Sequence, residues 1–188
     1  MDRLFELMSV VGPLSEQFKQ ALTNRMVLLS LPKNYVLLEA ANVSDHAYFL
    51  NSGVAMSFRY LDGKKHIEEF YLGGRIIVSP RSFFEQIPSK ESIQLIAPAE
   101  VLHISYSDVM QLLKFFPEAN VIYRTTMNLY YEESRDRIYD LHHLSAVERY
   151  EKLLRSIPHI EQLVPQEYIA SYLGIAPQSL SRIRRDSE

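Results

Sequence analysis

Six polar side chains near the C-terminus have the types and the spacing of a surface that reads DNA. Glutamine and arginine can make two-point hydrogen bonds to the edges of adenine and guanine, and serine can bond bases or phosphates. An ordinary helical hairpin with a solvated basic end carries similar residues, so this pattern alone leaves both interpretations open. The predicted DNA-binding residues are Gln178, Ser179, Ser181, Arg182, Arg184 and Arg185.

Two helices joined by a sharp turn must position these side chains. Apolar residues recur at helical spacing after Gln166, and Gly174 stands where a chain leaving a helix needs a positive φ. Pro177 fits the first turn of a second helix. Leu180 and Ile183, three residues apart, give that second helix a buried side. The spacing is typical of a DNA-reading helix-turn-helix.

The composition limits the classes of function. The chain has 188 residues and no cysteine, which excludes disulfides, thiolate metal sites, cysteine-held clusters and thiol catalysis. The formal net charge is −3, so DNA binding depends on a local basic patch, and a second copy would help by adding a second half-site. The sequence has no secretory signal and no apolar run of about 20 residues, so we expect a cytoplasmic protein without a membrane partner.

The region from Tyr35 to about Ser105 has the pattern of short strands. Runs rich in Val, Ile, Tyr and Phe alternate with turn signals, and Asp62-Gly63 between two extended runs predicts a tight hairpin. Many short strands at regular spacing favour an antiparallel sandwich or jelly roll, which gives an α+β fold class. The expected strands are 35–39, 47–50, 54–60, 65–71, 75–78, 92–97 and 100–105.

A long helix is expected from Pro117 to about Leu141. Within it, a stripe of residues recurs in steps of four and three, as in a coiled-coil seam. The stripe is equally typical of a long helix lying on the jelly roll, and the helix-turn-helix that follows favours the dimer seam. Two copies would then match a two-fold DNA site with half-sites about 34 Å apart. The predicted seam is Met127, Tyr131, Ser134, Ile138 and Leu141.

The boundary between two domains is predicted just after this helix. His142-His143-Leu144 reads as a hinge, and Ser145 with Glu148 forms a capping box that begins a new helix over 146–155. We therefore expect a sensor domain over 1–143, including the long helix, and a helix-turn-helix domain over 144–188.

The order of jelly roll, long helix, hinge and helix-turn-helix resembles the Crp–Fnr (catabolite-activator) family of bacterial transcription regulators. The segments that carry the resemblance are Tyr168–Ile175 with Gln178–Arg185, Tyr48–Val54, and Phe70–Gly74. The resemblance implies a homodimer that binds double-stranded promoter DNA and recruits or blocks RNA polymerase. It implies a jelly roll that senses a small effector, and a wing after the second helix, which we expect to be short or absent here.

The resemblance also indicates where an effector would bind. Cyclic-nucleotide members of the family carry a Gly-Glu pair followed by an Arg-Ser pair, whereas Val78-Ser79-Pro80-Arg81-Ser82 has no Glu beside a Gly. We therefore expect no cyclic AMP and no cofactor such as haem, and an effector, if one exists, is unidentified. The residues expected at such a pocket are Arg81, Ser82 and Lys90.

The alternative hypothesis is a cupin-like jelly-roll protein that binds a metal or a small molecule, with a structural helical hairpin at its C-terminus. A cupin site needs a His-x-His pair with further ligands on one ion. His46, His66 and His103 are far apart in the sequence and form no such pair. The sequence contains no nucleophile motif, phosphate loop or paired-carboxylate signature, so we expect neither an enzyme nor a metal site.

Overall fold

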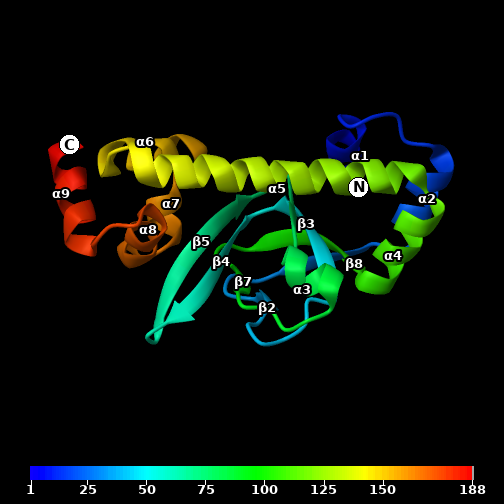
Figure 1. The fold of residues 1–188 in the computed structure, drawn as a ribbon, viewed down its shortest axis with the longest axis horizontal. Helices are drawn as coiled ribbons and strands as arrows, with labels where there is room; N and C mark the ends of the chain where they lie inside the picture. The colour runs from blue at the N-terminus through cyan, green and yellow to red at the C-terminus, as the bar shows by residue number, and fades with distance from the viewer. Residues whose placement is uncertain (188) are drawn as a thin grey trace.

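A long helix, α5 (Pro117–His143), runs along most of the length of the molecule, and the barrel and the other helices lie beside it or at its ends (Figure 1). The computed structural model describes residues 1–187, so Glu188, the last residue of the predicted domain over 144–188, lies outside the described residues. Within 1–187, no helix combines the length and the apolar character needed to cross a membrane. The other helices are α1 (Asp2–Ser9), α2 (Glu16–Thr23), α3 (Pro80–Glu85), α4 (Tyr106–Phe115), α6 (Ala146–Ser156), α7 (Ile160–Leu163), α8 (Gln166–Leu173) and α9 (Pro177–Ser187).

The strands form two four-stranded sheets in which every pairing is antiparallel, so the predicted α+β jelly-roll fold is confirmed. The first sheet has the order β1-β8-β3-β6, and the second has the order β2-β7-β4-β5. The strands are β1 (Val27–Leu31), β2 (Val36–Leu38), β3 (His46–Ser52), β4 (Val54–Leu61), β5 (Lys64–Leu72), β6 (Arg75–Ile77), β7 (Ser92–Leu95) and β8 (Ala99–Ser105).

Local sequence signals account for several of these boundaries. Asp62 and Gly63 both have positive φ, of 50° and 74°, which matches the twist of the β4–β5 hairpin that they join. Ser145 and Glu148 form the capping box at the start of α6. The side chain of Ser105 accepts the N–H of Asp108 at the start of α4. Each cap satisfies backbone donors that the first helical turn leaves unpaired.

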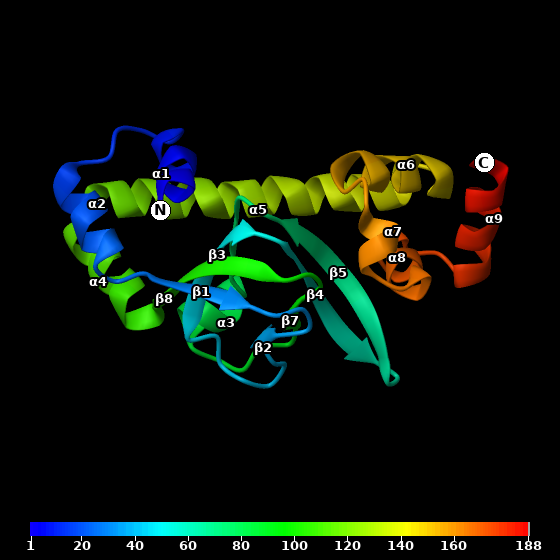
Figure 2. The ribbon, with the colours of Figure 1, turned by 180° about the vertical axis from the view of Figure 1, so that it is seen from behind.

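The core has two layers around the first sheet. Leu50 and Val101 point between the two sheets and are fully buried there. Their neighbours Phe49 and Leu102 point to the opposite face, because side chains alternate along a strand. Helices α1, α2 and α4 and the first part of α5 cover that outer face at the N-terminal end of the molecule (Figure 2).

A third apolar core joins the C-terminal helices to the second sheet. Phe58 and Phe70, on the β4–β5 hairpin, lie in one buried cluster with Ile169, Leu173 and Leu180 of α8 and α9. The chain after α5 therefore packs against the hairpin as well as following the long helix.

Three short elements were not expected from the sequence. Strand β1 pairs with β8 but alternates poorly between apolar and polar residues, and α7 has only four residues. Helix α3 has six residues and begins at Pro80, where no helix was predicted. Such short elements are set by tertiary packing more than by their own periodicity.

The turn between α8 and α9 gives a prediction about stability. Gly174 has a φ of +67°, and a Cβ atom built on it would lie 3.3 Å from Cδ2 of Leu141. We expect Gly174→Ala to lower the free energy of unfolding by about 1–2 kcal/mol, because an L side chain is strained in the left-handed region. Urea denaturation followed by circular dichroism measures this loss.

The matched control is Gly63→Ala, at a φ of +74°, where the added Cβ would meet no atom within 4 Å. Because both glycines have a positive φ, Gly63→Ala measures the cost of the left-handed conformation alone, without a new contact to Leu141. An unchanged stability in Gly174→Ala would contradict the assigned geometry of the turn.

Candidate nucleic-acid interface

Helices α8 and α9 are joined by a turn whose hydrogen bonds fix their relative orientation. The N–H of Ile175 donates to the carbonyl of Ala170 at 3.0 Å, and the N–H of Gly174 donates to that of Ser171 at 3.1 Å. These bonds satisfy carbonyls at the end of α8, as in a Schellman-type cap. Pro177 begins α9 within its first turn. The sequence features that predict a helix-turn-helix therefore each occupy the structural position expected for them.

The two faces of α9 differ in burial. Leu180 is fully buried and Ile183 is partly buried, and both pack on the apolar core that includes α8. Ser179 is half-buried, and the hydroxyl of Ser181 donates to the carbonyl of Pro177, one turn earlier, at 3.2 Å. The predicted reading residues that are exposed on α9 are Gln178, Ser181, Arg182 and Arg185.

Arg184 has a different environment from the other predicted reading residues. Its Nε lies 2.7 Å from Oε1 of Glu161, and both side chains are 30% exposed. The hydroxyl of Tyr150 donates to the same oxygen at 2.7 Å. Burial, together with this bond to Glu161, raises the pKa of Tyr150 to about 12. Arg184 thus anchors α9 to α6 and α7, and its charge is largely balanced inside its own domain.

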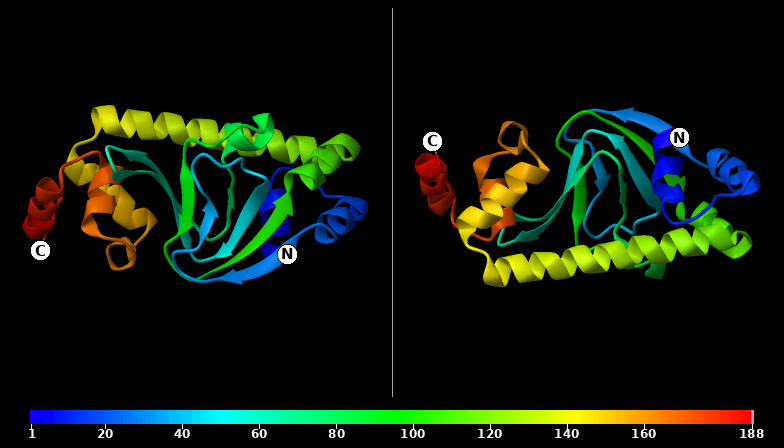
Figure 3. Two further views of the ribbon diagram at one scale, coloured as in Figure 1. Left: turned by 90° about the horizontal axis from the view of Figure 1, so that it is seen from below. Right: turned by 90° about the horizontal axis from the view of Figure 1, so that it is seen from above.

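Four of the predicted seam residues lie exposed along the flank of α5, whereas Met127 turns toward the N-terminal helices and the first sheet. Tyr131, Ser134, Ile138 and Leu141 are exposed, and Met127 is half-buried. Both views in Figure 3 show α5 at the margin of the molecule, with the sheets on its inner side. The Ser134 hydroxyl donates to the carbonyl of Tyr130, so it has a hydrogen-bond partner within its own helix. An apolar stripe is therefore available on this flank.

The residues predicted for an effector pocket do not share one environment. Arg81 is exposed, and its Nε lies 3.2 Å from Oε2 of Glu85 on the same helix. Ser82 is buried, where its hydroxyl donates to the carbonyl of Ile87 at 2.6 Å and accepts the N–H of Ser44 at 2.9 Å. Lys90 is exposed. Ser82 thus stabilises its loop, while the two basic side chains face solvent.

Two tyrosines occupy the space between the sheets and the long helix. The hydroxyl of Tyr130 on α5 donates to the carbonyl of Ile76 at 2.7 Å, and Tyr71 lies in the buried cluster between the sheets. Burial raises the pKa of each tyrosine well above its ordinary value. Both side chains are therefore neutral hydrogen-bonding fillers of the barrel core.

Two of the histidines, His46 and His103, are close together in space although they are far apart in the sequence. The rings of His46 and His103, on adjacent strands β3 and β8, lie 4.9 Å apart, and Nδ1 of His46 lies 2.7 Å from Oδ1 of Asp45. Desolvation and the neighbouring His46 lower the pKa of His103. Across residues 1–187, no group of three or more His, Cys, Asp or Glu side chains is arranged to hold a metal ion.

Comparison with known proteins identifies the architecture. No protein-family model and no curated protein sequence matches the chain. Among solved structures, FixK2 from Bradyrhizobium japonicum superposes with a TM-score of 0.72 at 16% identity, over 86% of this chain and 83% of that one. The regulator CLP from Xanthomonas campestris, described as c-di-GMP-responsive, gives 0.71 at 13% identity, over 92% and 91%. The chain has the Crp–Fnr regulator fold.

The likeness extends to the catabolite activator protein of Thermus thermophilus, with a TM-score of 0.58 at 16% identity, over 96% of this chain and 85% of that one. The Crp–Fnr fold thus includes the barrel, the long helix and the C-terminal helices of this chain. The sequence-based resemblance to this family is confirmed at the level of the fold, and the comparisons do not favour the cupin-like alternative.

A polar junction that the sequence did not reveal joins the two halves of this Crp–Fnr fold. The guanidinium of Arg137 on α5 lies 3.9 Å from the ring centroid of Tyr172 and donates to the carbonyl of Tyr172 at 2.7 Å. The Tyr172 hydroxyl lies 3.5 Å from Oε1 of Glu69 on β5. The N–H of Ile67, also on β5, donates to the hydroxyl of Ser171 at 3.0 Å. The only hint of this junction in the sequence is the charge of Arg137, which lies on α5 outside the predicted seam.

The junction makes stability depend on pH. Burial raises the pKa of Glu69 above the ordinary 4.5, and the N–H of Phe70 and Arg137 only partly offset this. The folded state therefore favours the protonated carboxyl, so its contribution is full below about pH 4.5 and is lost as the pH rises through the folded pKa. We expect Glu69→Gln to be more stable than the native chain at pH 7, with the difference vanishing near pH 4.

The control is Glu118→Gln, where the sign is opposite. The hydrogen bond from Ser15 lowers the pKa of the half-buried Glu118, so this carboxylate stabilises the fold above its unfolded pKa and loses that effect as the pH falls. Urea unfolding from pH 4 to pH 8 measures both variants. A Glu69→Gln chain that is less stable than native at pH 7 would contradict the assignment.

Proposed function

We propose that the protein is a sequence-specific, DNA-binding transcription regulator that acts as a homodimer. The observation that carries the proposal is the exposed face of α9, where Gln178, Arg182 and Arg185 stand on a helix whose other side is anchored by buried Leu180. Helix α9 is at the end of the molecule, beyond the end of α5 and away from the barrel (Figure 1). A helix in this position has room to enter a major groove.

The chemistry of that face supports the same role. Gln178 and Arg182 carry the amide and the guanidinium that pair with adenine and guanine edges, while Ser179, Ser181 and Arg185 suit phosphates. Arg184, held by Glu161, sets the position of the helix. Because the whole chain has a net charge of −3, DNA binding depends on the local basic residues of α9, and a pair of half-sites adds affinity that a single copy lacks.

The division of labour that we propose follows the helices. Residues 1–143 form the sensor domain and carry the seam, and 144–188 form the DNA-binding domain; α5 ends at His143 and α6 begins at Ala146. A regulator bound at a promoter acts by recruiting or blocking RNA polymerase. The proposed role of the exposed α9 side chains is to bind DNA, and it includes no step in which a covalent bond forms or breaks. We place this activity in the bacterial cytoplasm, the aqueous compartment that contains both DNA and RNA polymerase.

The role of α9 is tested with DNA. Duplexes enriched from a random pool by the full chain supply the probe. Fluorescence anisotropy measures the affinity over a roughly fourfold range of salt concentration, from about 50 to about 200 mM. We expect the logarithm of the affinity to fall linearly with the logarithm of the salt concentration. Arg182→Ala should reduce discrimination at one base pair by about 1–3 kcal/mol, because a bidentate contact is lost.

Arg155→Ala is the matched control, since Arg155 is an exposed arginine on α6 whose Nη1 lies 3.7 Å from Oε2 of its helical neighbour Glu151. It should leave base preference unchanged. If Arg182→Ala keeps both the affinity and the preference of the native chain, the reading role of α9 is wrong.

The seam is tested by charge. Ile138 is 57% exposed on the stripe, and Ile138→Glu would place two like charges across a two-fold interface. We expect this variant to sediment as a monomer at micromolar concentration and to bind DNA more weakly than the native dimer. Sedimentation velocity gives the first result and anisotropy the second.

Leu129→Glu is the control for the seam. Leu129 is 56% exposed on the same helix, nine residues away and thus on the opposite flank at about 100° per residue. It should stay dimeric. A native chain that is monomeric at every concentration tested, or an equal effect of the two substitutions, would refute the proposed seam.

A further inference from the structure

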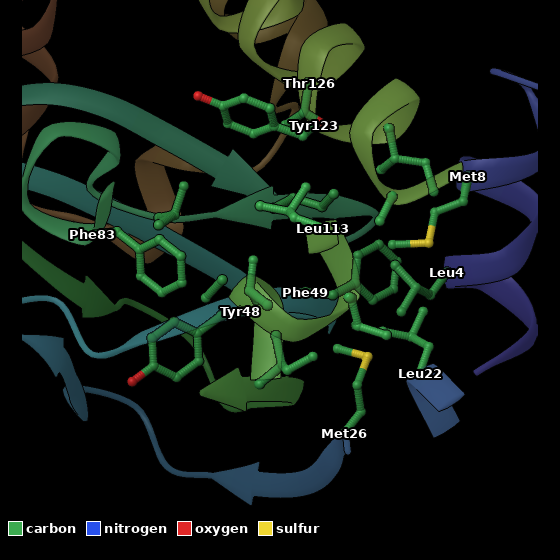
Figure 4. A pocket seen from close by; sticks show the side chains of 18 of the residues that line it. Leu4, Met8, Leu22, Met26, Tyr48, Phe49, Phe83, Leu113, Tyr123 and Thr126 are labelled. Atoms are coloured by element: carbon green, nitrogen blue, oxygen red, sulfur yellow. The ribbon is translucent and has the colours of Figure 1, made fainter. Parts of the chain in front are cut away.

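An apolar cavity of about 130 Å³ lies where the N-terminal helices and α5 meet the outer face of the first sheet. Figure 4 shows its side chains arranged in a ring, with Leu4 and Met8 from α1 on one side and Phe83 from α3 on the other. Phe49 of β3 and Ile104 of β8 form part of the sheet wall. The cavity is therefore built by elements that are far apart in the sequence.

The cavity lies mainly outside the barrel, although Tyr48 in its wall also packs against the core between the two sheets. Phe49 points toward the cavity, whereas its neighbour Leu50 points between the two sheets. The first sheet thus stands between most of the cavity and the core that contains Tyr71. Neither Arg81 nor Lys90, the basic residues considered above for an effector, belongs to its lining.

The lining offers a guest almost only carbon and sulfur atoms. The two tyrosines of the wall, Tyr48 and Tyr123, direct their hydroxyls away from the centre of the ring (Figure 4). The Tyr48 hydroxyl donates instead to the carbonyl of Leu37 at 3.1 Å. An ion or a strongly polar molecule would lose its water there and gain no partner, which costs several kcal/mol as a general rule. The chemistry of the wall selects an uncharged, apolar guest.

The size of the cavity sets the size of the guest. An apolar cavity of about 150 Å³ in another protein stays dry and takes up benzene or xenon. The space here is of the same order. Two of its wall positions are alanines, Ala47 on β3 and Ala119 on α5, where larger apolar residues would fill it. Half-buried Met8 and Met127 stand in the wall, and their flexible side chains can move aside to admit a guest.

We propose that this cavity is a binding site for an uncharged apolar molecule of benzene size, an aromatic or aliphatic hydrocarbon group of about six carbon atoms. The guest contacts α1, the first sheet and α5 together, including Tyr123 and Met127 of the long helix. Binding at this site does not depend on the regulator function proposed above, and its test uses no DNA.

The six methionines of the chain provide a direct test with benzene as the probe. Met8, Met26 and Met127 line the cavity, whereas Met56 is buried in the separate core that includes the C-terminal helices. In the full-length chain with ¹³C-labelled methionine methyl groups, a bound aromatic ring should shift the signals of the three lining methyls in a saturable way. The Met56 signal should stay in place.

Ala119→Leu tests the location of the guest by filling the cavity. Three added carbons would take roughly half the space of a six-carbon guest, so we expect the dissociation constant for benzene to rise at least tenfold. Ala21→Leu is the matched control, because Ala21 packs against the same core cluster without lining the cavity. It should bind benzene like the native chain.

Three results would overturn the proposal: no saturable shift in the native chain, equal shifts at Met56 and at the lining methyls, or unchanged binding in a folded Ala119→Leu. Should Ala119→Leu fail to fold, the methyl shifts of the native chain decide the question alone.

Discussion

The apolar core shared by the β4–β5 hairpin and the C-terminal helices determines where the proposed reading surface stands. Phe58 and Phe70 of the hairpin are buried in one cluster with Leu173 and Leu180. Burial of each such side chain contributes about 1.5–3 kcal/mol. The position of the C-terminal helices is therefore held by this packing, and not only by the short connection through residues 144–145. The polar contacts of Ser171 and Tyr172 add direction to it, since hydrogen bonds fix the angle at which apolar surfaces meet.

The shared core also joins the barrel to the C-terminal helices. The β4–β5 hairpin belongs to the second sheet of the barrel, and its strand β5 contacts α8 directly. Strand β5 is an edge strand, and the hydroxyl of Ser171 satisfies one of its free N–H groups. The helix domain therefore covers an edge that would otherwise be open to other strands. The same contact thus supports the stability of the barrel and the position of the helices that we propose bind DNA.

The features that could be predicted from the sequence depend on residues close together in the chain. The features that were missed depend on tertiary packing. The hairpin at Asp62-Gly63, the capping box at Ser145 and the turn at Gly174 are local, and each was predicted. The partner of Arg184 is Glu161, which is far from it in the sequence, and no spacing rule predicts the pair. The filling of the barrel by Tyr71 and Tyr130 likewise depends on tertiary packing. Arg81 and Glu85 have the i,i+4 spacing of a helical ion pair, but this pairing was missed because helix α3 was not predicted.

The long helix combines both kinds of information, because two of its flanks carry apolar residues for different reasons. The inner flank, with Ile122 and Tyr130, packs on the barrel and uses its polar positions for specific partners, such as Glu133 with Arg75. The second flank carries exposed Tyr131 and Ile138 one heptad apart. A helix already packed on one side gains nothing in its own fold from such residues on the other. A second copy of the same helix would present the same stripe and could bury these residues, which is the physical basis of the proposed seam.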